Sequence, residues 1–169
     1  PFRGYHLGSR VFTGNTVIPL NDEIVHGIGS HLRIQYGDIV NLDIGVIKYG
    51  WVGDPASTVP VGMIDERTEK LLRVTENALR RAISIASEGV RLGDVCSAVE
   101  EEAVTNRFSV VREFVGHGVG RKLHEEPQVP NYGRRGSGPR LKSGMTLAIE
   151  PMINAGTANV RLLDDGWTV

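Results

Sequence analysis

The chain has 169 residues, 40% of them hydrophobic, which is enough for one well-cored domain. Its 19 Lys and Arg residues nearly balance its 20 Asp and Glu residues, which excludes a broad basic surface for nucleic acid or an anionic membrane. A single cysteine, Cys96, excludes an internal disulfide framework, and no apolar run approaches the length of a membrane span. We therefore expect a soluble, cytoplasmic protein that binds neither nucleic acid nor membrane. We also expect a monomer, although the sequence carries no direct signal of its oligomeric state.

The first 35 residues are predicted to be irregular or strand-like, and residues 36–62 are predicted to form a β-hairpin that turns at Tyr49-Gly50. This turn would bring Asp43, at the end of the first apolar run, toward Asp54 on the returning strand. Two carboxylates in an apolar strand context repel each other and lose hydration, so a cation or a shared proton should compensate them. The alternative is a pair of solvated acids at strand ends.

Two helices are predicted to follow the hairpin. The first begins near Asp65 and ends at Gly89, and its apolar face is predicted from four residues at helical spacing: Leu72, Leu79, Ile83 and Ala86. The second spans about residues 92–106, with Cys96 as a small core residue, the acidic residues 100–102 as a solvated face, and an inward stripe at Val95, Val99 and Ala103.

From Phe108 onward the pattern again favours strands, over residues 108–115, 145–153 and 159–163. Residues 133–138 contain an arginine pair and are predicted to be a solvated loop.

Three further polar residues lie beside these apolar runs. His117 is flanked by glycines that would present it on a bend, His124 follows seven residues later, and Glu150 closes an apolar run just before a proline. Each residue alone is more often a structural or surface residue. Asp43, Asp54, His117 and Glu150, however, together form an oxygen-rich set with one imidazole. That set suits Mn, Fe, Co or Zn and differs from a closed structural zinc site built on thiolates.

At these residues the chain resembles the type I methionine aminopeptidases of peptidase family M24, in the wider creatinase and aminopeptidase superfamily. The matching phrases are NDEIVHGI (21–28), GDIVNLDIGVIKYGWVGD (37–54), FSVVREFVGHGVGRKLHEEPQV (108–129), GMTLAIEPMINAG (144–156) and DDGWTV (164–169). The resemblance implies an α+β pita-bread fold: two pseudo-symmetric halves curve one antiparallel-rich sheet around a dinuclear metal centre, with helices outside.

The resemblance also implies a single catalytic aminopeptidase domain over residues 1–169 that lacks the family's opening helices and its last strand. That strand carries a fifth ligand, a bridging Glu, so the fragment alone is expected to be inactive. Two divalent ions are implied, Asp43 binding one, Asp54 bridging both, and His117 and Glu150 binding the other. The ions would supply hydroxide near neutral pH.

The remaining roles follow from the same resemblance. Glu150 would shuttle a proton, His124 would donate a hydrogen bond to the oxyanion, and His26 would lie near the scissile amide. An apolar pocket would hold the thioether side chain, for which we nominate Phe12, Val17, Leu123, Trp167 and Tyr5, with plain core packing as the alternative for each.

The implied function is removal of the N-terminal methionine from peptides and nascent proteins, with the ribosome as one place of encounter. A prolidase-like dipeptidase is an alternative against which the HEEPQV phrase argues, and a non-catalytic peptide-binding module is another. Four features depart from the family pattern: Val17 in place of a frequent cysteine, Gly29 in place of a proline, Gly45 in place of a threonine, and an apparent insertion over residues 8–11.

Overall fold

The computed structural model of the protein describes residues 2–7, 9–29 and 31–169. The chain divides into two compact units: unit 1 comprises Pro1–Asp65, Gly120–Leu123 and Val160–Val169, and unit 2 comprises Glu66–Val119 and His124–Asn159. The first residue of the apparent insertion, Gly8, lies outside the described residues. The assignment of residues 1–169 to one catalytic domain stays a prediction.

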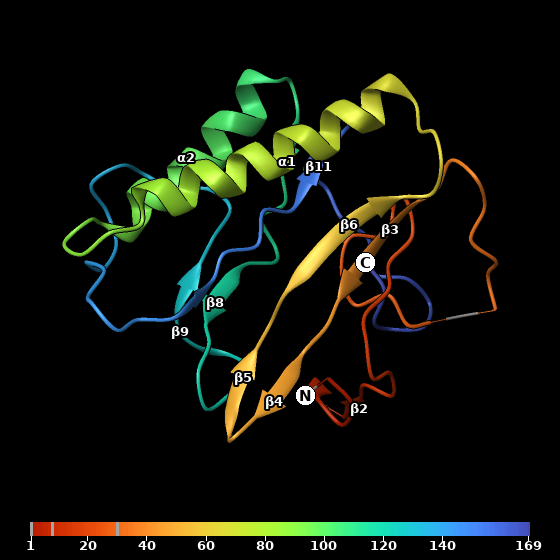
Figure 1. The fold of residues 1–169 in the computed structure, drawn as a ribbon, viewed down its shortest axis with the longest axis horizontal. Coiled ribbons are helices and arrows are strands. Elements are labelled where there is room, and N and C mark those ends of the chain that lie inside the picture. The colour runs from red at the N-terminus through yellow and green to blue at the C-terminus, as the bar shows by residue number, and fades with distance from the viewer. Residues whose placement is uncertain (1, 8, 30) are drawn as a thin grey trace. The chain divides into compact units, whose positions relative to one another are not determined.

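Unit 1 is built on a long β-hairpin with an interruption in each arm. The inner part pairs β3 (Ile39–Asp43) with β6 (Ala56–Pro60), and the outer part pairs β4 (Val46–Lys48) with β5 (Trp51–Gly53), both antiparallel. Figure 1 shows β4 and β5 as the orange and yellow tip that continues from β3 and β6. The predicted hairpin over residues 36–62 is therefore confirmed.

The turn at the tip of this hairpin lies at Tyr49 and Gly50, as predicted. Lys48 and Trp51 face each other across it. Both turn residues have positive φ, 52° at Tyr49 and 76° at Gly50, which is the conformation that a two-residue turn needs to match the right-handed twist of its strands. The single glycine thus accepts one of the two left-handed positions without strain.

The remainder of unit 1 is mostly irregular, as predicted for the first 35 residues. A minimal hairpin joins β1 (His6–Leu7) to β2 (Arg10–Val11). Val17 and Leu20 form isolated antiparallel bridges to β3. The strand β3 therefore has partners on both of its edges.

Unit 2 contains two helices that lie side by side, α1 (Glu66–Ile85) and α2 (Leu92–Thr105) (Figure 1). The predicted inward stripe of α2 is confirmed, because Val95, Val99 and Ala103 are all buried. Cys96 is a buried free thiol whose pKa is raised by burial to about 11, as befits a small core residue. In the part of the chain that the structure describes, no helix has both the length and the apolar character required to cross a membrane.

The buried stripe of α1 differs from the predicted one. Val74, Ala78 and Ala82 are buried, whereas Ile83, assigned to the inner face, is 56% exposed. The sequence offers more than one apolar stripe on this helix. The stripe that packs against α2 is the one rich in alanine, whose small side chains allow two helices to approach closely.

The acidic residues of α2 lie on a partly exposed face, as predicted, and in addition they form ion pairs with arginines. Glu101 accepts hydrogen bonds from Arg81 of α1 at 2.8 Å and from Arg135 at 2.6 Å. The hydrogen bond from Arg135, together with the charges of both arginines, lowers the pKa of Glu101 against the opposing effect of burial. The arginine-containing loop of residues 133–138 is thus linked to α2 as well as exposed to water.

Short strands complete unit 2. The central strand β8 (Gly116–Gly118) pairs antiparallel with β10 (Leu147–Ala148) on one side and β9 (Glu125–Val129) on the other, while β11 (Ile153–Asn154) pairs with β7 (Ser109–Val110). An apolar core lies where these strands and both helices pack together.

Several strand predictions are wrong in extent. Only two residues of the predicted strand 108–115 are in β7, the predicted strand 145–153 is divided between β10 and the start of β11, and residues 159–163 contain no strand. The strand β9 was not predicted, because its sequence EEPQV contains acids and a proline, which are depleted in strands.

The N-terminus of α2 generates the first testable prediction. The loop of residues 133–138 packs on Gly93, whose N–H donates to Ser137 O at 3.0 Å, and an added Cβ there would overlap the Arg134 carbonyl oxygen and Ser137 Oγ. Gly93→Ala should therefore lower the free energy of unfolding by about 1–3 kcal/mol, although alanine favours helix. Urea denaturation measures this. Gly156→Ala is the matched control, since its Cβ would meet open space, and equal stability of the two variants would contradict the prediction.

Candidate metal centre

The strand β8 places His117 between two neighbouring strands. A Cβ at Gly116 would overlap the Ala148 carbonyl oxygen of β10, and one at Gly118 would overlap the Glu126 carbonyl oxygen of β9. Only glycine permits this close approach, so the two glycines fix His117 in a buried central position. His117 therefore lies in a strand and not on the predicted bend, although the pairing of β8 with β9 is irregular between His117 and Gly118.

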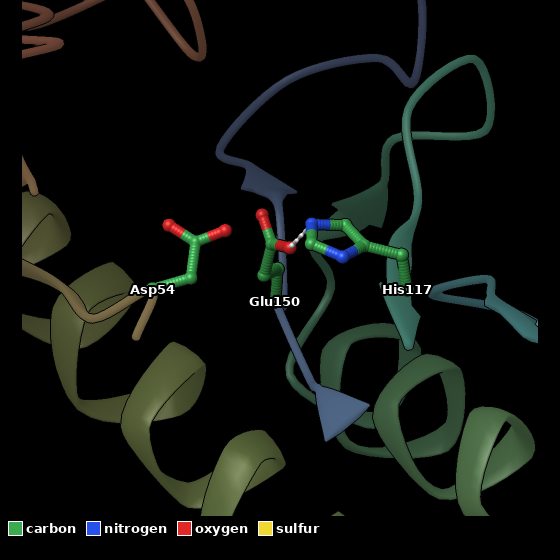
Figure 2. Close-up of side chains that lie close together, drawn as sticks. All are labelled: Asp54, His117 and Glu150. Carbon is green, nitrogen blue, oxygen red and sulfur yellow. Dashed lines mark ion pairs between the residues drawn. The ribbon is translucent and has the colours of Figure 1, made fainter. Parts of the chain in front are cut away.

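The imidazole of His117 points at the carboxylate of Glu150, which follows β10 (Figure 2). Its Nδ1 lies 2.8 Å from the Gly118 carbonyl oxygen, and since a carbonyl only accepts, Nδ1 carries the proton. In a neutral ring the Nε2 lone pair then faces Glu150 Oε1, 3.2 Å away. Two electron-rich atoms thus meet at close range.

This contact requires a positive charge. Glu150 Oε1 is buried and accepts no hydrogen bond from any residue that the structure describes, so the contact with His117 lacks hydrogen-bond geometry. A proton on Nε2 would make the contact an ion pair, whereas a divalent cation would be bound by both atoms at once. A ring whose Nδ1–H is held by a carbonyl while Nε2 faces outward is typical of metal-binding histidines. The donor set therefore fits a divalent metal ion.

His124 lies next to this pair in unit 2. It directly precedes β9, and its ring centroid is 4.4 Å from that of His117 with an interplanar angle of 74°. The ring is exposed. Three of the predicted site residues, His117, His124 and Glu150, are therefore brought together within one compact unit.

The two predicted aspartate ligands belong to unit 1. Asp43 ends β3 and exchanges two backbone hydrogen bonds with Val17, of 3.1 and 3.0 Å. Asp54 follows β5 in the interruption of the hairpin and is partly buried. Asp54 is the third residue drawn in Figure 2, and it offers a carboxylate oxygen, a ligand atom that divalent metals bind.

Three of the residues nominated for the apolar pocket form a cluster in unit 1. Phe12, Val17 and Trp167 are 3%, 2% and 6% exposed, and the Phe12 and Trp167 rings meet edge to face with centroids 5.2 Å apart. The other two nominees, Leu123 and Tyr5, are not among its members in the described chain. Phe2 and Ile28 pack against the cluster and were missed, because no local pattern distinguishes them.

His26 contacts this cluster through Trp167. The two ring centroids are 6.4 Å apart with an interplanar angle of 87°. His26 has a φ of 57°, an uncommon value for a non-glycine residue that is enriched at functional positions. Burial lowers the pKa of His26, because a low-dielectric surrounding disfavours the imidazolium. Burial therefore favours the neutral form of the ring.

We predict that NMR titration will give His26 a pKa below the ordinary value of about 6.5. As the pH falls below that value the unfolded chain takes up the proton first, so the free energy of unfolding decreases until the folded pKa is reached. The His26→Gln variant identifies the His26 resonance by its loss. The same variant should also show a weaker dependence of the free energy of unfolding on pH in this range. A pKa at or above 6.5 would contradict the burial seen here.

Comparisons with known proteins agree with this geometry. Residues 3–167 match metallopeptidase family M24. The chain is 48% identical over 168 residues to methionine aminopeptidase 1 of Bacillus subtilis, covering 99% of this chain and 66% of that protein. It is also 48% identical over 158 residues to the methionine aminopeptidase of Clostridium perfringens, covering 94% of this chain and 64% of that protein.

Solved structures give the same relationship. The crystal structure of methionine aminopeptidase from Thermotoga maritima matches with a TM-score of 0.92 and 44% identity, covering 98% of this chain and 67% of that chain. A prolidase from Pyrococcus furiosus is more distant, with a TM-score of 0.71 and 28% identity over 81% of this chain and 40% of that one.

These similarities confirm the predicted fold class, the α+β pita-bread fold of the methionine aminopeptidases and prolidases. The chain spans about two thirds of the length of the curated relatives it matches. It belongs to metallopeptidase family M24 and is a homologue of the methionine aminopeptidases.

Proposed function

We propose that this protein removes the N-terminal methionine from peptides and nascent proteins by metal-dependent hydrolysis. The observation that carries the proposal is the close contact between His117 Nε2 and the buried Glu150 Oε1, which a bound divalent cation would stabilise, in a chain homologous to methionine aminopeptidases. We place the reaction in the cytoplasm, in a monomer with residues 1–169 as one catalytic domain. Its partners are peptide and nascent-protein N-termini, met at the ribosome among other places, and neither nucleic acid nor membrane.

Four residues are proposed to hold two divalent ions of Co, Mn, Fe or Zn. Asp43, Asp54, His117 and Glu150 would hold these ions. The chemistry that such ions supply when bound is hydroxide near neutral pH, because they lower the pKa of water. The Nδ1–H of His117 is already committed to the Gly118 carbonyl, which orients Nε2 for this purpose.

Glu150 is proposed to move the proton of the reaction. A carboxylate has two oxygens, so one can remain a ligand while the other accepts a proton from the attacking water and gives it to the leaving amine. Glu150 is suited to both tasks, since its Oε1 faces His117 while the residue as a whole is only partly buried.

The two remaining histidines are proposed to act on the substrate amide. His124, exposed beside His117, donates a hydrogen bond to the oxyanion of the tetrahedral intermediate. His26, whose neutral form is favoured because burial lowers its pKa, lies near the scissile amide and in that form donates or accepts a hydrogen bond without adding charge.

The pocket for the methionine side chain is proposed to be lined by Phe12, Val17 and Trp167, with Leu123 and Tyr5 at its edge. Aromatic and branched aliphatic walls suit an unbranched, polarizable thioether. The cluster of the first three residues supports this proposal, although an apolar core alone would also bury them.

A prolidase-like activity is the second candidate, because solved prolidases share the fold. We predict that the full-length protein, supplied with Co²⁺ or Mn²⁺, releases methionine from Met-Ala and Met-Gly peptides and leaves X-Pro dipeptides intact. Glu150→Gln should lower kcat by roughly a thousandfold or more, since it removes an anionic ligand and the proton carrier together. Efficient cleavage of X-Pro dipeptides would favour the prolidase. A metal-binding protein that cleaves neither substrate would be a non-catalytic module.

His124 can be distinguished from a metal ligand by its kinetics. His124→Ala should lower kcat roughly a hundredfold, the scale of a lost oxyanion donor, while calorimetric titration shows little change in metal affinity. His31→Ala, which removes another exposed histidine, is the matched control and should leave kcat and metal affinity unchanged. Metal affinity that falls in parallel with kcat would instead make His124 a ligand.

A further inference from the structure

The carboxylate of Asp165 organises the short segment that carries Trp167. Its Oδ1 accepts hydrogen bonds from the backbone N–H groups of Trp167 and Thr168, both at 2.8 Å, and its Oδ2 accepts one from Thr168 Oγ1 at 2.5 Å. Both oxygens are therefore used locally. Burial alone would raise the pKa of Asp165, but these three hydrogen bonds outweigh it and lower the pKa.

Further hydrogen bonds from Leu163 and Arg10 hold the same segment. Gly166 adopts a φ of 73° and donates from its N–H to Leu163 O at 2.9 Å, and its carbonyl accepts from the Arg10 guanidinium at 2.5 Å. Thr168 O accepts from the Leu163 N–H at 2.8 Å. Trp167 thus lies in a tight loop. Asp165 accepts hydrogen bonds from the two backbone N–H groups of this loop that no backbone carbonyl in the described part of the chain accepts.

The position of this loop determines the two aromatic contacts of the Trp167 ring. The Trp167 ring meets Phe12 and His26 edge to face. Directly after it, Val169 exchanges backbone hydrogen bonds with Ile24 and Val25, of 2.6 and 3.2 Å, so the chain just before His26 is held beside the chain just after Trp167. A rotation of the loop would therefore change the contacts of both rings.

We propose that Asp165 is a positioning residue for the methionine pocket: by holding the Trp167 loop, it fixes the indole against His26 and Phe12 and so sets the shape of the pocket wall. The inference rests on the proposed function for the meaning of the pocket. It predicts that loss of the carboxylate impairs recognition of the side chain that is removed and leaves metal binding intact, because neither Asp165 nor Trp167 is among the proposed ligands.

The test uses Asp165→Ala in a Trp51→Phe background, where Trp167 is the remaining one of the protein's two tryptophans. Asp164→Ala is the matched control, since it removes the neighbouring exposed carboxylate. Asp165→Asn keeps an oxygen for the two backbone donors and should rescue, while Thr168→Val removes the hydroxyl bond alone and remains informative where Asp165→Ala does not fold. The readouts are Trp167 fluorescence, metal affinity by calorimetry, and kinetics on a Met-Ala peptide.

In Asp165→Ala we expect a red-shifted Trp167 emission and a KM about tenfold higher, with a smaller change in kcat and no change in metal affinity. Asp165→Asn should lie within about threefold of the parent. Unchanged emission, or an unchanged KM in an active parent, overturns the inference. A parent that cleaves no peptide contradicts the proposed function instead, and the fluorescence then decides the positioning role by itself.

Discussion

The arrangement of unit 2 depends on one unfavourable contact, the lone pair of His117 Nε2 facing a buried oxygen of Glu150. The Glu150 side chain is 32% exposed, so only part of the cost of burying a carboxylate applies, but a compensating positive charge would still stabilise the contact. The hydrogen bond from Nδ1–H to the Gly118 carbonyl prevents the neutral ring from relieving the contact by donating through Nε2. The protein thus keeps a site that favours a cation before any cation arrives.

Main-chain packing holds this contact in place. The strand β8 has glycine on each side of His117 because the carbonyl oxygens of β9 and β10 occupy the space that a Cβ would need. Behind this sheet, the core that joins the strands to α1 and α2 includes Val110 and Val129 as buried members. The rigidity that a preorganised site requires therefore comes from backbone contacts supported by an apolar core.

Features encoded by neighbouring residues could be predicted from sequence, and features that depend on distant partners could not. The Tyr49-Gly50 turn and the inward stripe of α2 are local patterns, and His117 and Glu150 were identified because polar residues at strand ends need partners. The stripe of α1 depended on which of its apolar faces meets α2. Glu101 is bound by arginines 20 and 34 positions away, and no local signal indicates such pairs.

The pairing of Val17 with Asp43 shows that the backbone position of Asp43 does not depend on the side chain at residue 17, where the sequence departs from the family pattern. Both hydrogen bonds between the two residues are made by backbone atoms, so they do not depend on the side chain at position 17. That side chain packs instead with Phe12 and Trp167. A change at this position therefore alters the proposed pocket wall, whereas the backbone of the proposed ligand Asp43 keeps its place.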